Sequence, residues 1–449
     1  MRAYMRLCAC LALAHNIRAL ASKASKAALT DRLRGEIILA PLTRGGTAPF
    51  RKLCTEHGAT ATMGEMVFAK FLLKGDRREQ ARLRRFAGEG LFGCQIATNT
   101  IAEGIAACEI AAEAGADWMD LNCGCPIFEA TRRGLGSVLL RKPHKLATLA
   151  RGLVEGSRIP VSLKLRLSAD GATSSNYIEH VQALRELGDA APAFVTLHGR
   201  TATARYKTPA NWEMIEAAAA EGSKDSEFAP LPLVGNGDVL TFYEAEARLK
   251  LAPSAHGLMV GRGALICPWI FDDIKRGTTW CPTAEERVAV YWRLACLFKE
   301  HFGDDAVGWR SVEYFLPWHF DFFCRWRPLR VEHFGDLALA GPLIQNSRDV
   351  DAVLLGIEGD LEPLDQLLRS ESPKGHAAIA AALWLAPNVN DAVSALRGLA
   401  TIENLLAWKT RAADADDETE GHSAKPPRAP KAPRPIRDRP TRGDAIIIQ

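Results

Sequence analysis

The chain has 449 residues, of which 47% are hydrophobic, so it is too long for one ordinary domain and can bury a large core. Its formal net charge of +3 is small and argues neither for nor against a nucleic-acid partner. The eleven cysteines follow neither a zinc-binding spacing nor a compact disulfide framework, which indicates a reducing compartment and no structural metal. No apolar stretch approaches the ~18–20 residues of a membrane span, so we expect no membrane segment.

The N-terminal extension, residues 1–34, is basic. Its first thirty residues contain no Asp or Glu but carry Arg2, Arg6, Arg18, Lys23 and Lys26. Such a start resembles an organelle transit peptide, and a solvated, partly helical lead-in is the alternative interpretation. We expect a cytoplasmic protein, with the nucleus as the alternative, or a mitochondrion or plastid if the extension is a transit peptide.

From Glu36 onward, β-rich runs alternate with helical patterns. The predicted strands are Glu36–Ala40, Ala59–Met63, Leu91–Ile96, Ala116–Leu121, Pro160–Leu167, Ala193–His198, Leu231–Gly235 and Gly257–Val260. The predicted helices are Pro49–His57, Ala102–Ala114, Lys145–Gly156, Asn176–Leu187, Trp212–Ala220, Tyr243–Leu251 and Ala264–Lys275. Eight strand-then-helix units over roughly 240 residues predict an α/β fold, a TIM (β/α)8 barrel at residues 35–280.

Beyond the barrel the pattern becomes helical. Helices are predicted at Thr283–Phe302, Asp360–Leu368 and Asp391–Trp408, with a run rich in aromatic and arginine residues between Trp309 and Arg330. We interpret residues 281–411 as a small all-helical domain. The Pro/Arg/Lys-rich residues 412–449 cannot form a core and are predicted to be a disordered tail, which either holds RNA phosphates loosely or binds nothing specific.

Polar or glycine-rich residues follow every predicted strand, at the end of a TIM barrel where chemistry takes place. The fourth strand leads into Asn122-Cys123-Gly124-Cys125-Pro126, a turn that would hold Cys125 at the strand tip. The fifth strand carries Lys164, and the sixth ends at His198. Taken singly, these residues also fit buried structural cysteines, a snorkelling lysine and a satisfied core histidine.

The last two strands end in Gly235-Asn-Gly and Gly261-Arg-Gly. These segments supply close backbone approach, N–H groups and a guanidinium, which suits the terminal phosphate of flavin mononucleotide (FMN). Lys164 suits the electron-rich edge of a flavin ring, and Gln95 and His198 can donate to or accept from ring atoms.

Seven motifs occur in a characteristic order. They are Leu39-Ala-Pro-Leu-Thr43, Gly64-Glu-Met66, Asp120-Leu-Asn-Cys-Gly-Cys-Pro126, Leu163-Lys-Leu-Arg166, Leu197-His-Gly-Arg-Thr201, Gly235-Asn-Gly-Asp238 and Met259-Val-Gly-Arg-Gly263. With them the chain resembles the tRNA-dihydrouridine synthases, most closely the eukaryotic branch that acts on uridine 47. That branch often carries CCCH zinc fingers before the barrel, and none is present in this sequence, so position 47 is less secure than the family.

The resemblance implies that Cys125 is the catalytic acid and gives Cys123 no such role. It implies that FMN is bound by Pro41, Leu42, Thr43, Gln95, Lys164, His198, Asn236, Gly237, Asp238, Gly261 and Arg262. NADPH would reduce FMN, hydride would pass from flavin N5 to uridine C6, and Cys125 would deliver a proton to C5. A thiol with an ordinary pKa near ~8.5 is mostly protonated at neutral pH and can act as that acid.

The implied substrate is tRNA, mRNA is left open, and we lean towards a monomer. The candidate RNA-binding residues are Arg132, Arg133, Arg205, Lys207, Arg325, Arg327 and Arg330. One rival is an FMN-barrel reductase of a small molecule, against which the helical domain and basic tail argue. The other is a catalytically dead RNA-binding scaffold, against which the joint presence of Cys125, Lys164 and Arg262 argues.

Overall fold

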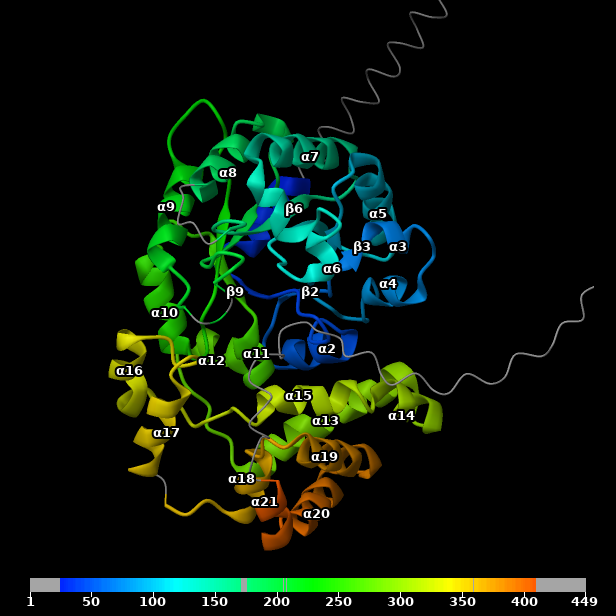
Figure 1. Ribbon diagram of the computed structural model, residues 1–449, viewed down its shortest axis with the longest axis vertical. Coiled ribbons are helices and arrows are strands. Elements are labelled where there is room, and N and C mark those ends of the chain that lie inside the picture. The colour runs from blue at the N-terminus through cyan, green and yellow to red at the C-terminus, as the bar shows by residue number, and fades with distance from the viewer. Residues whose placement is uncertain (1–24, 171–175, 205, 207, 358, 409–449) are drawn as a thin grey trace, which may run out of the picture. The chain divides into compact units, whose positions relative to one another are not determined.

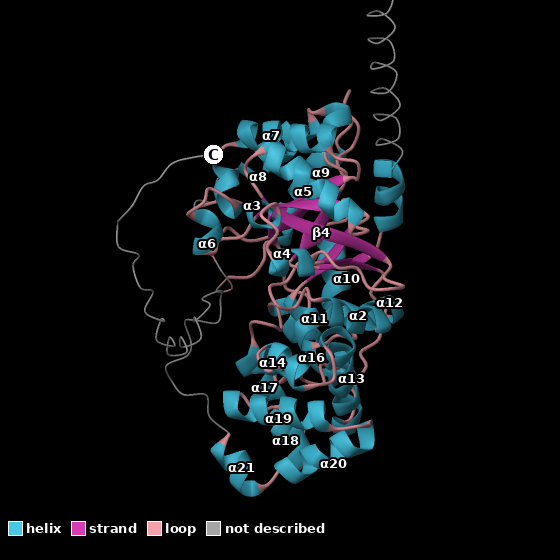
Figure 2. Cartoon of the chain, turned by 90° about the vertical axis from the view of Figure 1, so that its right-hand side faces the viewer, coloured by secondary structure: helices cyan, strands magenta, loops and turns pink. Residues whose placement is uncertain are grey.

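The computed structural model describes residues 25–170, 176–204, 206, 208–357 and 359–408. Its first part contains one parallel sheet of nine strands, surrounded by helices (Figures 1 and 2). Its strands are β1 (Ile37–Leu39), β2 (Ala61–Met63), β3 (Val67–Phe68), β4 (Leu91–Ala97), β5 (Trp118–Cys123), β6 (Val161–Arg166), β7 (Val195–His198), β8 (Leu233–Asn236) and β9 (Gly257–Val260). Because β1 pairs with both β2 and β9, and β2 also pairs with β4, the sheet closes into a barrel. The predicted TIM barrel is confirmed.

Two short strands share the second position of the ring. β2 pairs with the start of β4, with Ala61 beside Leu91, and β3 pairs with its end, with Val67 beside Ile96. The break between them is Gly64-Glu65-Met66, the segment in which the second predicted strand ends. The break therefore lies towards the carboxyl end of the barrel.

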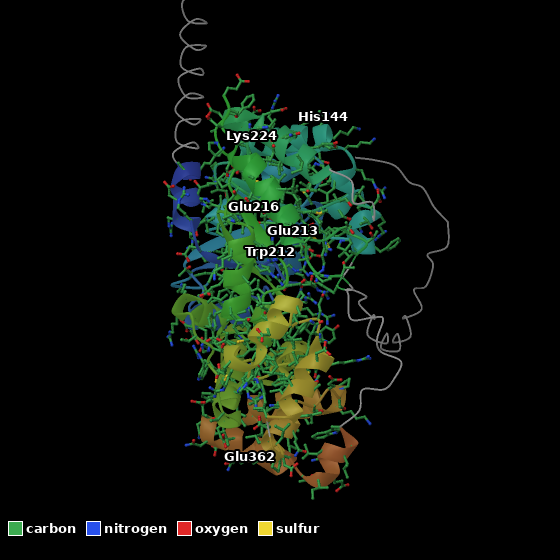
Figure 3. All side chains as sticks on the ribbon, turned by 90° about the vertical axis from the view of Figure 1, so that its left-hand side faces the viewer. His144, Trp212, Glu213, Glu216, Lys224 and Glu362 are labelled. Atoms are coloured by element: carbon green, nitrogen blue, oxygen red, sulfur yellow. The ribbon has the colours of Figure 1, made fainter. Side chains whose placement is uncertain are left out.

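Helices surround the barrel (Figure 1). The longer ones are α2 (Ala48–Glu56), α5 (Ile101–Glu113), α7 (Pro143–Gly156), α8 (Asn176–Arg185), α9 (Trp212–Ser223), α10 (Phe242–Leu251) and α12 (Ile270–Arg276). Shorter ones are α3 (Ala69–Leu72), α4 (Arg77–Arg82), α6 (Phe128–Thr131), α11 (Arg262–Ile266), and the 3-10 turns η1 (Gly136–Arg141) and η2 (Gly188–Ala190). Figure 3 labels Trp212, Glu213 and Glu216 on α9, the helix that packs against β8.

A second group of helices follows the barrel, which confirms the predicted helical region. They are α13 (Ala284–Phe302), α14 (Ala306–Val312), α15 (Phe315–Phe323), α16 (Val331–Ala340), α17 (Ser347–Leu355), α18 (Pro363–Leu368), α19 (Pro373–Leu385), α20 (Val389–Leu399) and α21 (Ile402–Ala407). This region shares one apolar core with the barrel helices. At the contact, Phe50 of α2 stacks on the buried His319 of α15, with 4.8 Å between ring centroids.

The sequence prediction was wrong in some helix limits. The predicted helix Ala264–Lys275 is divided into α11 and α12, because Pro268 cannot donate a backbone hydrogen bond and clashes with a continuing helix. The predicted helix Asp391–Trp408 is divided where Thr401 caps α21 by accepting from the Asn404 N–H. Helices α14, α15, α16, α17 and α19 were not predicted individually.

The inside of the barrel is apolar at one end only. Ile38, Met63, Trp118, Val234 and Met259 fill the amino end of the strands. Residues 25–33 form a helix, and its buried Leu29 and Leu33 belong to the same apolar cluster. Polar inward-facing residues are therefore confined to the carboxyl end, where TIM barrels carry their sites. Among the helices of the described residues, none is long and apolar enough to span a bilayer.

Candidate active site

A polar layer lies directly above the apolar floor of the barrel. The strand register aligns Gln95 of β4 with Asp120 of β5, and Asp120 with Ser162 of β6. The Asp120 carboxylate accepts hydrogen bonds from Ser162 Oγ at 2.6 Å and from Gln95 Nε2 at 2.8 Å. None of the three residues is more than 2% exposed. Burial raises the pKa of Asp120 to about 6, which leaves it mostly ionised at neutral pH.

The turn after β5 is anchored to this layer through Asn122. Asn122 Nδ2 donates to Gln95 Oε1 at 2.8 Å, and Asn122 Oδ1 accepts from the N–H groups of Gly124 at 3.2 Å and Cys125 at 2.9 Å. On the other side, the Ser137 N–H donates to the Cys125 carbonyl oxygen at 3.0 Å. The backbone of Cys125 is thus fixed on both sides at the mouth of the barrel, where the sequence analysis places it.

The two thiols of the turn have different surroundings. Cys125 is half-buried, whereas Cys123 is fully buried and its Sγ donates to the Leu121 carbonyl at 3.6 Å. Strand alternation puts Cys123 on the outer face of the barrel, so it has no access to the mouth. Burial raises the pKa of the Cys125 thiol, although the nearby charges of Arg166 and Lys164 work in the opposite direction. Cys125 therefore stays protonated at neutral pH.

Lys164 and Asn236, both predicted site residues, meet across the mouth. Lys164 Nζ donates to Asn236 Oδ1 at 3.0 Å, and Asn236 Nδ2 donates to the Met259 carbonyl at 2.8 Å. Burial, followed by the charge of Arg166, lowers the pKa of Lys164 to about 8. The ammonium group is thus held in place and poorly solvated, and it would respond strongly to negative charge developing beside it.

Asp238, a predicted cofactor-binding residue, is held by contacts within the protein. Its fully buried carboxylate accepts from Arg200 Nη2 at 2.8 and 2.6 Å and from Arg262 Nη2 at 3.1 Å. It also accepts from the Ala210 N–H at 2.7 Å. With these four contacts the carboxylate is occupied by the protein. We therefore regard Asp238 as the residue that orients Arg262, and Arg262 as the group that can face an anion.

The glycine turns beside Arg262 fit a phosphate. Gly237 has φ +132°, and a Cβ there would lie 2.5 Å from the Ala210 side chain. Within the described residues, the backbone N–H groups of Gly237 and Gly261 donate no hydrogen bond to another group. Two N–H donors beside a guanidinium are a suitable donor set for a phosphate dianion. The residues present thus fit the phosphate end of FMN.

The remaining predicted cofactor residues lie around the same mouth. His198 Nε2 lies 3.3 Å from Arg200 Nη1, and because arginine only donates, Nε2 must accept and Nδ1 must carry the proton. Burial lowers the pKa of His198 well below its ordinary value, so the ring is neutral. Pro41, Leu42 and Thr43 form the loop after β1, in which Leu42 would lie 3.5 Å from a Cβ placed on Gly261.

The candidate RNA-binding residues are not brought to one place by any contact of the described residues. Arg132 and Arg133 both pair with Glu129, at 2.6 Å each, and Arg205 and Lys207 lie outside the described residues. Arg325 and Arg330 are exposed. Arg327 is occupied by Asp351 at 2.8 Å and by the carbonyls of Cys324 and Trp326. Arg327 therefore serves the fold of the helical region.

Sequence reasoning gave no role to five polar residues at or below the mouth, although its motifs contain four of them, Asp120, Asn122, Arg166 and Arg200. The fifth is Ser162. Arg166 lies against the catalytic turn, where a Cβ on Gly124 would come within 3.2 Å of its Cγ, and its Nη1 donates to the Thr201 carbonyl at 3.0 Å. The two-residue period of Asp120 and Asn122 on one strand, and of Ser162, Lys164 and Arg166 on the next, is the signal that could have found them.

The chain is a closed parallel barrel whose carboxyl end carries a fixed thiol, a half-buried lysine and a glycine-flanked arginine, which defines a TIM-barrel protein with a polar site at its mouth. The family model described as dihydrouridine synthase (Dus) matches residues 38–307. The chain belongs to the dihydrouridine synthase family.

The curated relatives that match the chain share about one-third sequence identity with it. The human protein named "tRNA-dihydrouridine(47) synthase [NAD(P)(+)]-like" is 34% identical over 299 residues, which cover 66% of this chain and 44% of that protein. The Coprinopsis cinerea protein named "tRNA-dihydrouridine(47) synthase [NAD(P)(+)]" is 34% identical over 303 residues, covering 66% and 44%. The chain thus spans less than half the length of these relatives. Histamine dehydrogenase from Rhizobium sp. 4-9 matches 58% of this chain and 49% of its own, at 13% identity and a TM-score of 0.39.

Proposed function

We propose that the protein is an FMN-dependent tRNA-dihydrouridine synthase that uses NADPH to reduce the C5=C6 bond of a uridine in tRNA. The observation that carries this proposal is the hydrogen-bonded Cys125 beside the half-buried Lys164 at the mouth of a dihydrouridine-synthase barrel. The names of the relatives support tRNA as the substrate and uridine 47 as the position. We retain a monomer as our expectation.

Each part of the mouth has a separate task in this proposal. Bound FMN would supply the hydride for uridine C6. The Cys125 thiol would give its proton to C5, because burial keeps that proton on sulfur. Lys164 would stabilise negative charge on the ring that it faces, and Gln95 and His198 would fix the ring edge by hydrogen bonds. Arg262, oriented by Asp238, would bind the phosphate with the N–H groups of Gly237 and Gly261.

The target base has to leave its stack before it can enter the barrel mouth. Unstacking costs a few kcal/mol, which contacts to the surrounding RNA have to offset. Exposed cations beside the mouth and in the helical region, Arg325 and Arg330 among them, are candidates for phosphate contacts. We propose a reducing compartment, the cytoplasm, because the nine cysteines of the described residues are all free thiols.

An anaerobic flavin assay tests the proposal. The protein is loaded with FMN and its visible absorbance is bleached with one equivalent of NADPH, after which unmodified tRNA is added. Return of the flavin absorbance, together with dihydrouridine in the tRNA, supports the function. A protein that bleaches but ignores tRNA would instead be a reductase of a small molecule, and a protein that cannot bind FMN would be a scaffold.

Two cysteine variants make the assay specific. Cys125→Ala removes the proposed acid and is expected to slow dihydrouridine formation about 10²–10⁴-fold, the usual contribution of a general acid, without changing the bleaching by NADPH. Cys123→Ala is the matched control, because it removes a buried thiol two residues away that lies on the outer face of the barrel, away from the mouth. Equal product from the Cys125→Ala protein would refute the acid role.

A further inference from the structure

Asp120 is a buried carboxylate to which the proposed reaction gives no task. It is fully buried, and the interior of a TIM barrel is ordinarily filled by branched apolar side chains. Removing a carboxylate from water costs several kcal/mol unless hydrogen bonds compensate. Asp120 is compensated by two hydrogen bonds, from the Ser162 hydroxyl and the Gln95 amide, and by the nearby charge of Lys164.

The carboxylate dictates the direction of a hydrogen-bond chain. An ionised carboxylate only accepts, so Gln95 must turn its Nε2 towards Asp120 and its Oε1 towards Asn122. Asn122 must then present its Nδ2 to Gln95, which leaves its Oδ1 facing the turn. The Asp120 carboxylate thereby sets the orientation of both the Gln95 and the Asn122 amide groups.

The far end of the chain is the backbone that carries the thiol. Asn122 Oδ1 accepts from both the Gly124 and the Cys125 N–H groups. If the two amides were reversed, an NH₂ group would face two backbone N–H groups, and neither would have an acceptor. An unpaired donor costs up to about 1–3 kcal/mol when it is fully buried, and these two are half-buried, so the direction imposed by Asp120 still favours one place for Cys125.

We propose that Asp120 is a positioning residue for Cys125, acting through Gln95 and Asn122 to hold the catalytic turn in the orientation that presents the thiol to the barrel mouth. Asp120 touches neither the thiol nor the space above it. The consequence for catalysis rests on the proposed function, whereas the consequence for the turn does not.

Amide hydrogen exchange tests the positioning directly. In the full chain, the peptide that contains Gly124 and Cys125 is followed by mass spectrometry. Asp120→Ala is expected to speed exchange of these amides about tenfold, the factor that corresponds to the net loss of one hydrogen bond. Asp120→Asn, which has the same shape but offers a donor as well as an acceptor, is expected to speed it about threefold.

The matched control is Asp117→Asn. Asp117 lies at the other end of the same strand, where it accepts from the Phe92 N–H at 2.8 Å and pairs with Arg85 at 3.1 Å. This variant loses the same charge and should leave exchange at the turn unchanged. Unchanged exchange in a folded Asp120→Ala protein would overturn the proposal, as would equal acceleration in the control. If Asp120→Ala fails to fold, unchanged exchange at the turn in Asp120→Asn would overturn the proposal instead.

A second readout separates this inference from the proposed function. In a single turnover, transfer from the NADPH-bleached protein to tRNA is expected to slow at least about tenfold in Asp120→Ala, because a misplaced proton donor is a poor one. Bleaching by NADPH does not use the thiol, so it should slow less than the transfer to tRNA does, and any slowing of bleaching reports on Gln95 and Lys164, which also interact with Asp120. If the wild-type protein ignores tRNA, the proposed function fails while the exchange experiment still decides the role of Asp120.

Discussion

Replacing Asp120 by Asn should stabilise the protein at neutral pH although it loosens the catalytic turn. Asn resembles a protonated carboxyl group in shape and charge, so the variant avoids the burial of a carboxylate. The pKa of Asp120 is about 6 in the folded protein, against an ordinary value of 3.8. That difference corresponds to about 3 kcal/mol at 1.36 kcal/mol per pKa unit, an upper figure because Asn does not reproduce every contact.

The difference in stability between Asp120→Asn and the wild-type protein depends on pH because the pKa of Asp120 is raised in the folded state. Between about pH 4 and about pH 6 the folded protein binds more protons at Asp120 than the unfolded chain does, so stability falls as pH rises through this window. Asp120→Asn lacks this loss. Its advantage over the wild-type protein should therefore be near zero at about pH 4 and approach its full size at about pH 7.5.

Thermal unfolding of both proteins at these two pH values is the assay. A gain of about 3 kcal/mol corresponds to a rise in Tm of a few degrees for a chain of this size. A variant that is less stable than the wild-type protein by the same amount at both pH values would refute the reasoning, because Asp120 would then be an ordinary stabilising partner of Ser162 and Gln95. Circular dichroism at both pH values confirms that the two proteins start from the same fold.

Three further predictions concern other contacts. Gly136→Ala should destabilise the protein by at least about 1 kcal/mol, seen as a lower Tm, because Gly136 has φ +64° and a Cβ there would lie 2.4 Å from the Cys125 carbonyl oxygen. Burial disfavours the charged form of His376, but the contact with Asp321 prevails and raises the pKa of His376 to about 9. The stability that protonated His376 contributes should therefore be lost as pH rises from about 6.5 to about 9. Thermal melts of His376→Gln should lack this pH-dependent loss. Gln345→Ala should weaken FMN binding several-fold in a fluorescence titration. Gln345 Nε2 donates to the carbonyls of Tyr206 at 2.7 Å and Thr208 at 3.1 Å, and the Tyr206 ring centroid lies 3.5 Å from Arg262 Cζ, so the variant would loosen the ring that packs on Arg262.

Each of these variants has a clear contrary outcome. An unchanged Tm in Gly136→Ala would mean that the turn adapts at no cost. Parallel melts of the wild-type and His376→Gln proteins across the alkaline window would remove the titration of that histidine from the account. Gln366→Ala is the control for Gln345, since among the described residues its Nε2 donates to the nearby Leu361 carbonyl at 2.7 Å, and equal FMN affinity in the two variants would disprove the link.

The sequence predicted the barrel and the position of its mouth because both depend on local signals. Strand runs end in Asn, Gly and Pro wherever the chain has to turn, and those ends share one side of any parallel barrel. Cys125, Lys164 and Asn236 followed directly from that rule. The polar layer of Gln95, Asp120 and Ser162 could have been read from strand alternation, but only after the register between strands was known.

Other parts of the site depend on contacts between distant segments. The role of Asp238 follows from the loop that brings Arg200 and the Ala210 N–H onto its carboxylate, and no local pattern reveals that approach. Arg327 looked like a free cation in the sequence because its partner Asp351 comes from a helix that was not predicted. Charge alone therefore does not show whether an arginine is available to a partner, whereas the end of a strand shows which residues lie at the mouth of the barrel.

The helix of residues 25–33 limits how the N-terminus could be shortened in a cell. Leu29 and Leu33 are 4% and 1% exposed, Lys26 Nζ donates to the Ala191 carbonyl at 2.7 Å, and His256 Nε2 lies 2.7 Å from the Thr30 carbonyl oxygen. A processing peptidase that cut upstream of Lys26 would leave the amino end of the barrel sealed. A cut beyond Leu33 would open that end to water and expose Trp118 from below. Any import signal that is removed after delivery therefore has to lie within the residues before this helix.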